Sequence, residues 1–169
     1  MTDPDSMDFD EMSLRLLRYV ESDFELSLDE LSDELGLSKS AIHYRLNKLK
    51  DNNVIQDVTA DINPLSFGLN MVAITEVRVR HEEGYSENIG ESLASVSGVE
   101  QVYYTMGDVD FITISRVQNR SQMNDLIDEI IGISGVDETS SRFVMDEIKT
   151  SPKVMQSVSK SVEESLLKD

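Results

Sequence analysis

The sequence contains no cysteine and no tryptophan, and only two of its 169 residues are histidines. The lack of cysteine excludes disulfide bonds, thiolate metal sites and a cysteine nucleophile. Because His43 and His81 are the only histidines, a histidine-based metal cluster is not expected, and we predict neither a metal nor a cofactor. The chain also lacks a phosphate-binding loop and a nucleophile–base pattern, so we do not expect an enzyme.

Long apolar runs are missing as well. No stretch approaches the roughly 18 residues of a membrane-spanning helix. The start of the chain, "MTDPDSMDFDEM", is acidic and lacks the basic end and apolar run of a signal peptide. We therefore expect a cytoplasmic protein without membrane contact, and its 39% hydrophobic content is sufficient for a folded core.

Basic residues are few: 15 Lys and Arg stand against 33 Asp and Glu, which gives a formal net charge of -18. The excess of acids is spread evenly over residues 1–68 and 69–169. Such a surface repels itself at low salt and becomes tolerable when salt screens it. This pattern favours adaptation to a salt-rich cytoplasm, as in halophilic archaea, over an ordinary acidic protein.

One stretch departs from this acidity. Residues 35–50, "LGLSKSAIHYRLNKLK", contain four Lys or Arg and no acid. Upstream of it, Phe9, Met12 and Leu16 recur at three- and four-residue intervals, which predicts a helix over residues 9–21. The acid-free stretch therefore belongs to a domain that begins with a helix.

Two further helices are predicted by their end signals. Ser27 followed three residues later by Glu30 is a capping-box signal for a second helix. Gly36 ends this helix, and Ser38 can cap a third one. Two helices joined by a short turn that contains Gly and Ser have the layout of a helix-turn-helix.

The third helix has an apolar and a polar side. If Ile42 points inward, Leu46 and Leu49 lie on the same side. The other side carries polar groups that can hydrogen-bond base edges in a major groove, and basic residues that can contact phosphates. DNA phosphates would repel a carboxylate there, which explains the acid-free run; the alternative is a solvated helix that lacks acids by chance. The predicted DNA-binding residues are Ser38, Lys39, Ser40, His43, Tyr44, Arg45, Asn47 and Lys48.

The pattern changes after the third helix. Residues 54–62 suggest a short strand pair or wing, and residues 71–79 alternate as a strand with one drier face. Helix and strand patterns then follow in the order β-α-β-β-α-β. The tripeptide Ser-Gly-Val recurs between helix and strand, at Gly98 and at Gly135. This order with an internal repeat predicts a split βαβ, ferredoxin-like domain. Its sheet has helices on one face, and a second copy is the simplest cover for the other, which implies a homodimer.

The chain resembles the leucine-responsive regulatory protein/AsnC (feast/famine) family over about residues 8–149, on the motifs "DFDEMSLRLLRYV", "LSDELGLSKSAIHYRLNKLKDNNVI", "SGVEQVYYTMGDVDF" and "GVDETSSRFVMDEIK". The resemblance implies an α+β fold with an N-terminal winged helix-turn-helix domain and a C-terminal ferredoxin-like (RAM/ACT-like) domain. It implies a sequence-specific transcription regulator that binds double-stranded DNA, dimerises, and can assemble further to tetramers or octamers.

The resemblance also implies that an amino acid or related small effector binds between C-terminal domains. The family's G-x-x-D turn corresponds to residues 107–110, and its T-x-T pattern to residues 139–141, with Ser141 in place of the second threonine. The turn amides would hold the effector's carboxylate, and a carboxylate such as Asp110 its ammonium group. The alternative is a tight hairpin in which Gly107 serves only the backbone. The expected effector-binding residues are Gly107, Asp108, Asp110, Thr139 and Ser141.

Residues 150–169 extend past the family pattern. Pro152 can start a helix, and Val154, Val158, Val162 and Leu166 are four residues apart, so we predict a helical extension that tightens oligomers. The predicted organisation is a helix-turn-helix domain (1–51), a wing or linker (52–69), a ferredoxin-like dimerisation and effector domain (70–149) and this tail (150–169).

Two other functions stay open at this point. The chain can be an architectural protein that coats DNA without an effector. It can also be a ligand-sensing module that acts through protein partners and whose helix-turn-helix no longer reads bases.

Overall fold

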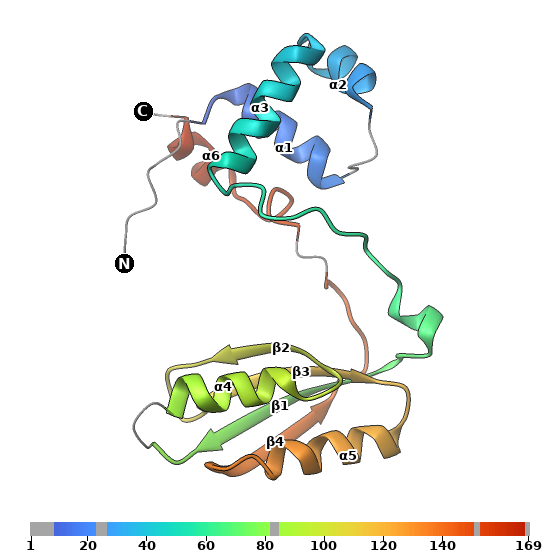
Figure 1. Cartoon of the computed structure of the whole chain (residues 1–169), viewed down its shortest axis with the longest axis vertical. Helices are drawn as coiled ribbons and strands as arrows, with labels where there is room; N and C mark the ends of the chain where they lie inside the picture. Colours follow the sequence, from blue (N-terminus) through green and yellow to red (C-terminus); the bar gives the residue numbers. More distant parts are fainter. Residues whose placement is uncertain (1–8, 23–26, 82–84, 151–152, 168–169) are drawn as a thin grey trace. The chain divides into compact units, whose positions relative to one another are not determined.

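The computed structural model describes residues 9–22, 27–81, 85–150 and 153–167 (Figure 1). The chain forms two compact units. The described part of the first unit lies within Met1–Ala60 and Thr150–Asp169, and the second unit is Asp61–Lys149. The predicted α+β class and the βαββαβ order of the second unit are confirmed. No helix within the described residues is long and apolar enough to cross a membrane.

The first unit is built on three helices, α1 (Glu11–Ser22), α2 (Leu28–Leu35) and α3 (Lys39–Asp51). Their shared core consists of buried aliphatic side chains, namely Leu16, Leu31, Leu35, Ile42 and Leu49. The predicted capping box at the start of α2 is confirmed. The Ser27 hydroxyl accepts the Glu30 backbone N–H at 3.2 Å, and the Glu30 carboxylate accepts the Ser27 backbone N–H at 2.8 Å.

The turn between α2 and α3 follows from two residues. Gly36 ends α2 with φ of 66°, in the left-handed region that residues with a Cβ disfavour, and its N–H donates to the Ser32 carbonyl at 2.9 Å. Ser38 caps α3, since its hydroxyl accepts the Ala41 N–H at 3.2 Å. The predicted helix-turn-helix is therefore formed by local chemistry at both ends of the turn.

The strand pair predicted over residues 54–62 is not formed. The backbone N–H groups of Val54 and Ile55 donate to the Leu49 carbonyl at 2.8 and 3.2 Å, and both side chains pack against the three-helix core. The helical core thus uses Val54 and Ile55, so they are not available to pair with the segment that follows, in which Val58 and Ile62 stay exposed. This segment has no regular structure, and the 3₁₀ helix η1 (Pro64–Phe67) follows it.

The tail packs on α1 within the same unit. Arg18 forms an ion pair with Glu163, and the Met155 N–H donates to the Glu21 carboxylate at 2.8 Å. Leu14 lies on the same side of α1 as Arg18 and Glu21 and is 3% exposed, although it is outside the three-helix cluster. The tail is therefore attached to the side of α1 that carries Arg18 and Glu21.

The helical part of the tail is shorter than predicted. Pro152 lies outside the described residues, and helix α6 spans Lys160–Leu166. The predicted stripe is largely exposed, since Val154, Val162 and Leu166 are at the surface. The tail is therefore held mainly by polar contacts with α1.

The second unit is a four-stranded antiparallel sheet with the order β2-β3-β1-β4. Helices α4 and α5 cover one face of it (Figure 1). The elements are β1 (Met71–Val79), α4 (Tyr85–Ser95), β2 (Val99–Tyr104), β3 (Phe111–Val117), α5 (Arg120–Ile131) and β4 (Val136–Phe143). Alternation along each strand places one set of side chains against the helices and the other set on the open face.

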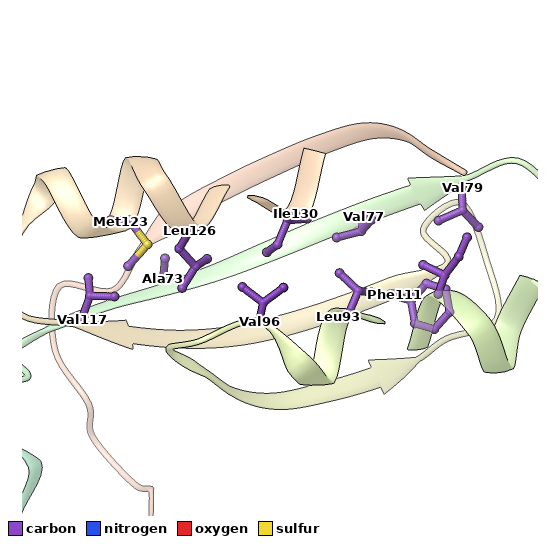
Figure 2. Close-up of a cluster of buried hydrophobic side chains, with 11 residues drawn as sticks. Ala73, Val77, Val79, Leu93, Val96, Phe111, Val117, Met123, Leu126 and Ile130 are labelled. Carbon is purple, nitrogen blue, oxygen red and sulfur yellow. The ribbon is translucent and has the colours of Figure 1, made fainter. Parts of the chain in front are cut away.

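The core lies between the sheet and its two helices (Figure 2). Ala73 and Val77 of β1 and Phe111 of β3 face side chains of α4 and α5 such as Leu93 and Ile130, and all five are at most 1% exposed. The drier face predicted for residues 71–79 is therefore the face that the helices cover.

The repeated Ser-Gly-Val tripeptide has the same backbone role twice. Gly98 and Gly135 have φ of 92° and 97°, each between a helix and the strand that follows. A Cβ on Gly98 would lie 2.9 Å from a methyl carbon of Leu126 and 3.2 Å from the Arg116 carbonyl oxygen. Glycine is needed there both for its backbone angle and for space.

Replacing Gly98 with alanine should therefore lower the free energy of unfolding by about 2–4 kcal/mol, because left-handed strain and overpacking add. Gly90 is the matched control, since it lies inside α4 and its added Cβ would meet Phe111 at an ordinary 3.5 Å. Gly90→Ala should raise stability by about 0.5–1 kcal/mol. Chemical denaturation measures both, and equal effects would contradict the role of Gly98.

Candidate functional site

Helix α3 presents one polar side to the outside. Ile42 and Leu49 are fully buried against α1 and α2, which turns the opposite side outward. Tyr44 is 69% exposed, and His43 and Asn47 are exposed beside it. These three side chains offer a phenol, an imidazole and an amide, which are groups that can bond to base edges.

Two of the exposed side chains of α3 are joined. The side-chain nitrogen of Asn47 lies 3.2 Å from Nδ1 of His43, one helical turn earlier. At the start of the helix, the hydroxyls of Ser38 and Ser40 are 3.1 Å apart, and Ser38 is used as the cap. Lys48 is exposed at the other end of the helix, next to Lys50, which the predicted set omits although it has the same charge and exposure.

Two predicted DNA-binding residues take part in ion pairs with other helices. The Arg45 guanidinium donates to both carboxylate oxygens of Asp10, at 2.7 and 2.6 Å, and to the Ser13 hydroxyl at 3.0 Å. Lys39 forms an ion pair with Asp29 of α2. Arg45 therefore ties α3 to the start of α1, a role that its position in the sequence alone does not reveal.

Asp10 also holds the start of α1. Its carboxylate accepts the Ser13 backbone N–H at 2.7 Å, as a helix cap does. Burial would raise the pKa of Asp10, but the hydrogen bonds from Arg45 and Ser13 outweigh it, so the pKa lies below its usual 3.8. One carboxylate thus links α3 to α1 in its ionised form.

The stability that Asp10 contributes should depend on pH. Because its pKa is lowered on folding, this contribution is complete above the unfolded-state pKa near 4 and is lost as the pH falls through the lower folded value. Between pH 6 and pH 3, the wild type should lose more unfolding free energy than Asp10→Asn, whose side chain does not titrate. Urea unfolding at fixed high salt measures this difference.

Arg45→Ala supplies the control for this experiment. In that background the main donor to Asp10 is gone, so Asp10→Asn should change the pH dependence much less. Equal acid sensitivity of the wild type and Asp10→Asn would contradict the role of this carboxylate.

The second candidate region is the turn between β2 and β3. Gly107 has φ of 143°, which favours glycine, and Asp108 beside it is exposed. The Arg78 guanidinium donates to the Asp108 carbonyl oxygen at 2.9 Å and to the Glu138 carboxylate at 2.9 Å. Arg78 thereby connects this turn to β4, which sequence reasoning did not anticipate because the three residues are far apart in the chain.

Asp110 is engaged by its own domain. One carboxylate oxygen accepts the Val79 N–H at 2.9 Å, and the other lies 2.6 Å from Nε2 of His81. Burial would raise the pKa of Asp110, but the hydrogen bonds from Val79 and His81 outweigh it and the pKa is lowered. The side chain is 13% exposed, so Asp110 anchors the turn to the end of β1.

The predicted β4 residues lie on the side of the sheet that faces the helices. Thr139 pairs with Val77 of β1, and Asp110 donates its N–H to the carbonyl oxygen of the same Val77 at 3.2 Å. Thr139 is therefore at the same end of the sheet as the Gly107 turn. Ser141 is two residues further along, and its hydroxyl bonds to that of Thr75 at 2.8 Å. The structure thus brings Thr139 closer to the turn than Ser141.

Both halves of the chain match known protein families. A model described as winged helix-turn-helix DNA-binding matches residues 9–56, and one described as Lrp/AsnC ligand binding domain matches residues 72–154. The HTH-type transcriptional regulator FL11 of Pyrococcus horikoshii is 34% identical over 136 residues, which are 80% of this chain and 89% of that protein. The regulator LysM of Sulfurisphaera tokodaii is 31% identical over 82% of this chain and 96% of its own.

Solved structures share the fold. A transcriptional regulator of Neisseria meningitidis in complex with L-Met has a TM-score of 0.81 at 23% identity, covering 86% of this chain and 96% of its own. AsnC of Escherichia coli has a TM-score of 0.77 at 20% identity, covering 84% and 95%. A helix-turn-helix unit followed by a ligand-binding unit of this kind defines a DNA-binding transcription regulator. The chain belongs to the Lrp/AsnC family of these regulators.

Proposed function

We propose that the outward side of α3 enters the major groove of DNA and that this chain regulates transcription by reading sequence there, without catalysing a reaction. The observation that carries the proposal is the orientation of α3. Its apolar residues Ile42 and Leu49 are buried, and its exposed side carries His43, Tyr44 and Asn47. Ser38, Ser40 and Lys48 flank them and can contact phosphates. The place of action is the cytoplasm, where the DNA lies.

Helix α3 has four basic residues, but only some of them are available to contact DNA phosphates. Lys39 and Arg45 are in ion pairs with Asp29 and Asp10, which leaves Lys48 and Lys50 as the basic residues of α3 with no ion pair to any described residue. Each phosphate contact contributes a slope of about -0.9 to the dependence of log affinity on log salt. The affinity should therefore fall less steeply with salt than that of a strongly basic regulator.

Lys48→Ala tests this placement of the helix. Affinity should fall by a similar factor on all DNA sequences, and the salt slope should become shallower by about one for each protomer on the DNA. Arg120→Ala at the start of α5 changes the net charge equally in the other unit and should leave the slope unchanged. Fluorescence anisotropy over a potassium chloride series measures both, and identical slopes for the two variants would contradict the proposal.

We also propose that an L-amino acid or a related metabolite binds at the turn of Gly107–Asp110. The Lrp/AsnC ligand-binding domain and the L-Met complex of the Neisseria regulator support this. Because both oxygens of Asp110 are already engaged, the exposed carboxylate of Asp108 is the better partner for an ammonium group. Thr139 lies at the same end of the sheet and Ser141 two residues further on.

Calorimetric titration with the twenty L-amino acids, methionine first, tests this site. At least one should bind, and Asp108→Asn should weaken it by tenfold or more because a charge-assisted hydrogen bond is lost. Asp125→Asn on α5 removes the same charge from an exposed helix position and should bind normally. The absence of binding by every amino acid would contradict an amino-acid effector, and equal binding by both variants would contradict this site.

A homodimer through the open face of the sheet completes the proposed function. This face carries apolar side chains on three neighbouring strands, such as Ile74, Ile114 and Tyr103, and Ile74 and Tyr103 are 37% and 52% exposed. Covering them with a second copy removes apolar surface from water and presents two recognition helices to two half-sites. A monomeric mass in light scattering at high salt would contradict the homodimer. Assembly to a tetramer or octamer is a further expectation.

A further inference from the structure

Asn47 and His43 form a hydrogen-bonded pair on the exposed side of α3. They are four residues apart, so they are neighbours on adjacent turns, and the Asn47 amide nitrogen lies 3.2 Å from Nδ1 of His43. An amide nitrogen can only donate, so Nδ1 must accept. In this pair the ring presents its Nδ1 lone pair to Asn47 and carries its proton on Nε2.

This bond determines what Asn47 can offer to a partner. One of its two N–H bonds is used by His43, which leaves one N–H donor and the carbonyl acceptor. Within the described residues no other side chain hydrogen-bonds the Asn47 amide, so His43 alone holds its orientation. If the amide turned over, its oxygen would face Nδ1, and a bond could form only if the ring carried its proton on Nδ1 instead of Nε2.

One donor beside one acceptor is the pattern that adenine complements. In the major groove adenine presents the N7 acceptor and the N6 donor, whereas guanine presents two acceptors there. A bidentate contact between Asn and adenine is worth about tenfold or more in discrimination against another base.

We propose that Asn47 recognises an adenine in the major groove and that His43 is a positioning residue that fixes the orientation of the amide. This proposal rests on the proposed placement of α3 on DNA and names the base that it reads. The operator should contain an adenine at an equivalent position of each half-site.

Selection of binding sites from a random DNA library, with the full-length protein at high potassium chloride, tests the proposal. The wild type should select one adenine per half-site, and replacing that A·T pair with G·C should weaken binding about tenfold or more. Asn47→Ala should lose this preference at that position only. Asn47, His43 and Arg120, the residues varied in this experiment, are all exposed, and circular dichroism checks that each variant is folded.

The role of His43 needs a readout beyond affinity. His43→Ala should reduce the preference for adenine at that position, while His43→Gln, whose amide oxygen can accept from Asn47, should restore part of it. Nitrogen NMR of the wild type should show the His43 ring protonated at Nε2, and Asn47→Ala should shift the two tautomers toward a mixture. Arg120→Ala, outside the DNA-binding unit, is the control and should keep the adenine preference.

The outcomes separate this inference from the placement of α3. If Asn47→Ala weakens all sequences equally while Lys48→Ala lowers the salt slope, α3 lies on DNA and the adenine contact is wrong. If none of these variants changes binding, the placement of α3 itself is wrong. If Asn47→Ala loses the preference but His43→Ala keeps it, adenine recognition stands and the positioning role of His43 is overturned.

Discussion

The burial of Ile42 and Leu49 between α1 and α2 decides which side of α3 faces outward. Both side chains are completely buried, and exposing either would cost about 1.5–3 kcal/mol of apolar transfer free energy. Rotating the helix would also place His43 or Asn47 in an apolar interior without partners, which is a further penalty. The polar side of α3 is therefore available to DNA because the apolar side has one stable place to pack.

Acidic residues outside α3 also affect this helix, although α3 itself contains no acid before Asp51. Carboxylates from the neighbouring helices pair with two of its basic residues, Arg45 and Lys39. The Arg45 pair is partly shielded and involves both oxygens of Asp10, so salt screens it less than an exposed pair such as Lys39 with Asp29. In this arrangement two of the four basic residues of α3 hold the three helices together. On the proposed placement of α3, contacts with bases would therefore have more weight than contacts with phosphates. In a salt-rich solution, attraction to phosphates would be weak in any case.

Local chemistry explains why much of the fold could be predicted. The capping box at Ser27, the left-handed Gly36 and the alternation of residues 71–79 each depend on residues close together in the chain. The repeated glycines at 98 and 135 mark the same kind of junction in both halves of the second unit. Where a distant contact competes, prediction failed: Val54 and Ile55 pack onto the helical core instead of forming a strand pair.

The candidate sites divide in the same way. The exposed set on α3 followed from helical periodicity, but the ion pair of Arg45 with Asp10 did not, because the two residues are 35 positions apart. At the Gly107 turn, the sequence indicated the glycine and the acids. It did not indicate Arg78 and His81, which contact Asp108 and Asp110 from β1 and from the end of β1. The sequence by itself determined the elements, their order and the acid-free side of α3, because periodicity and capping act within a few residues. Only the tertiary structure decided which charged groups are paired and which remain exposed, because ion pairs and burial join residues that the chain keeps far apart.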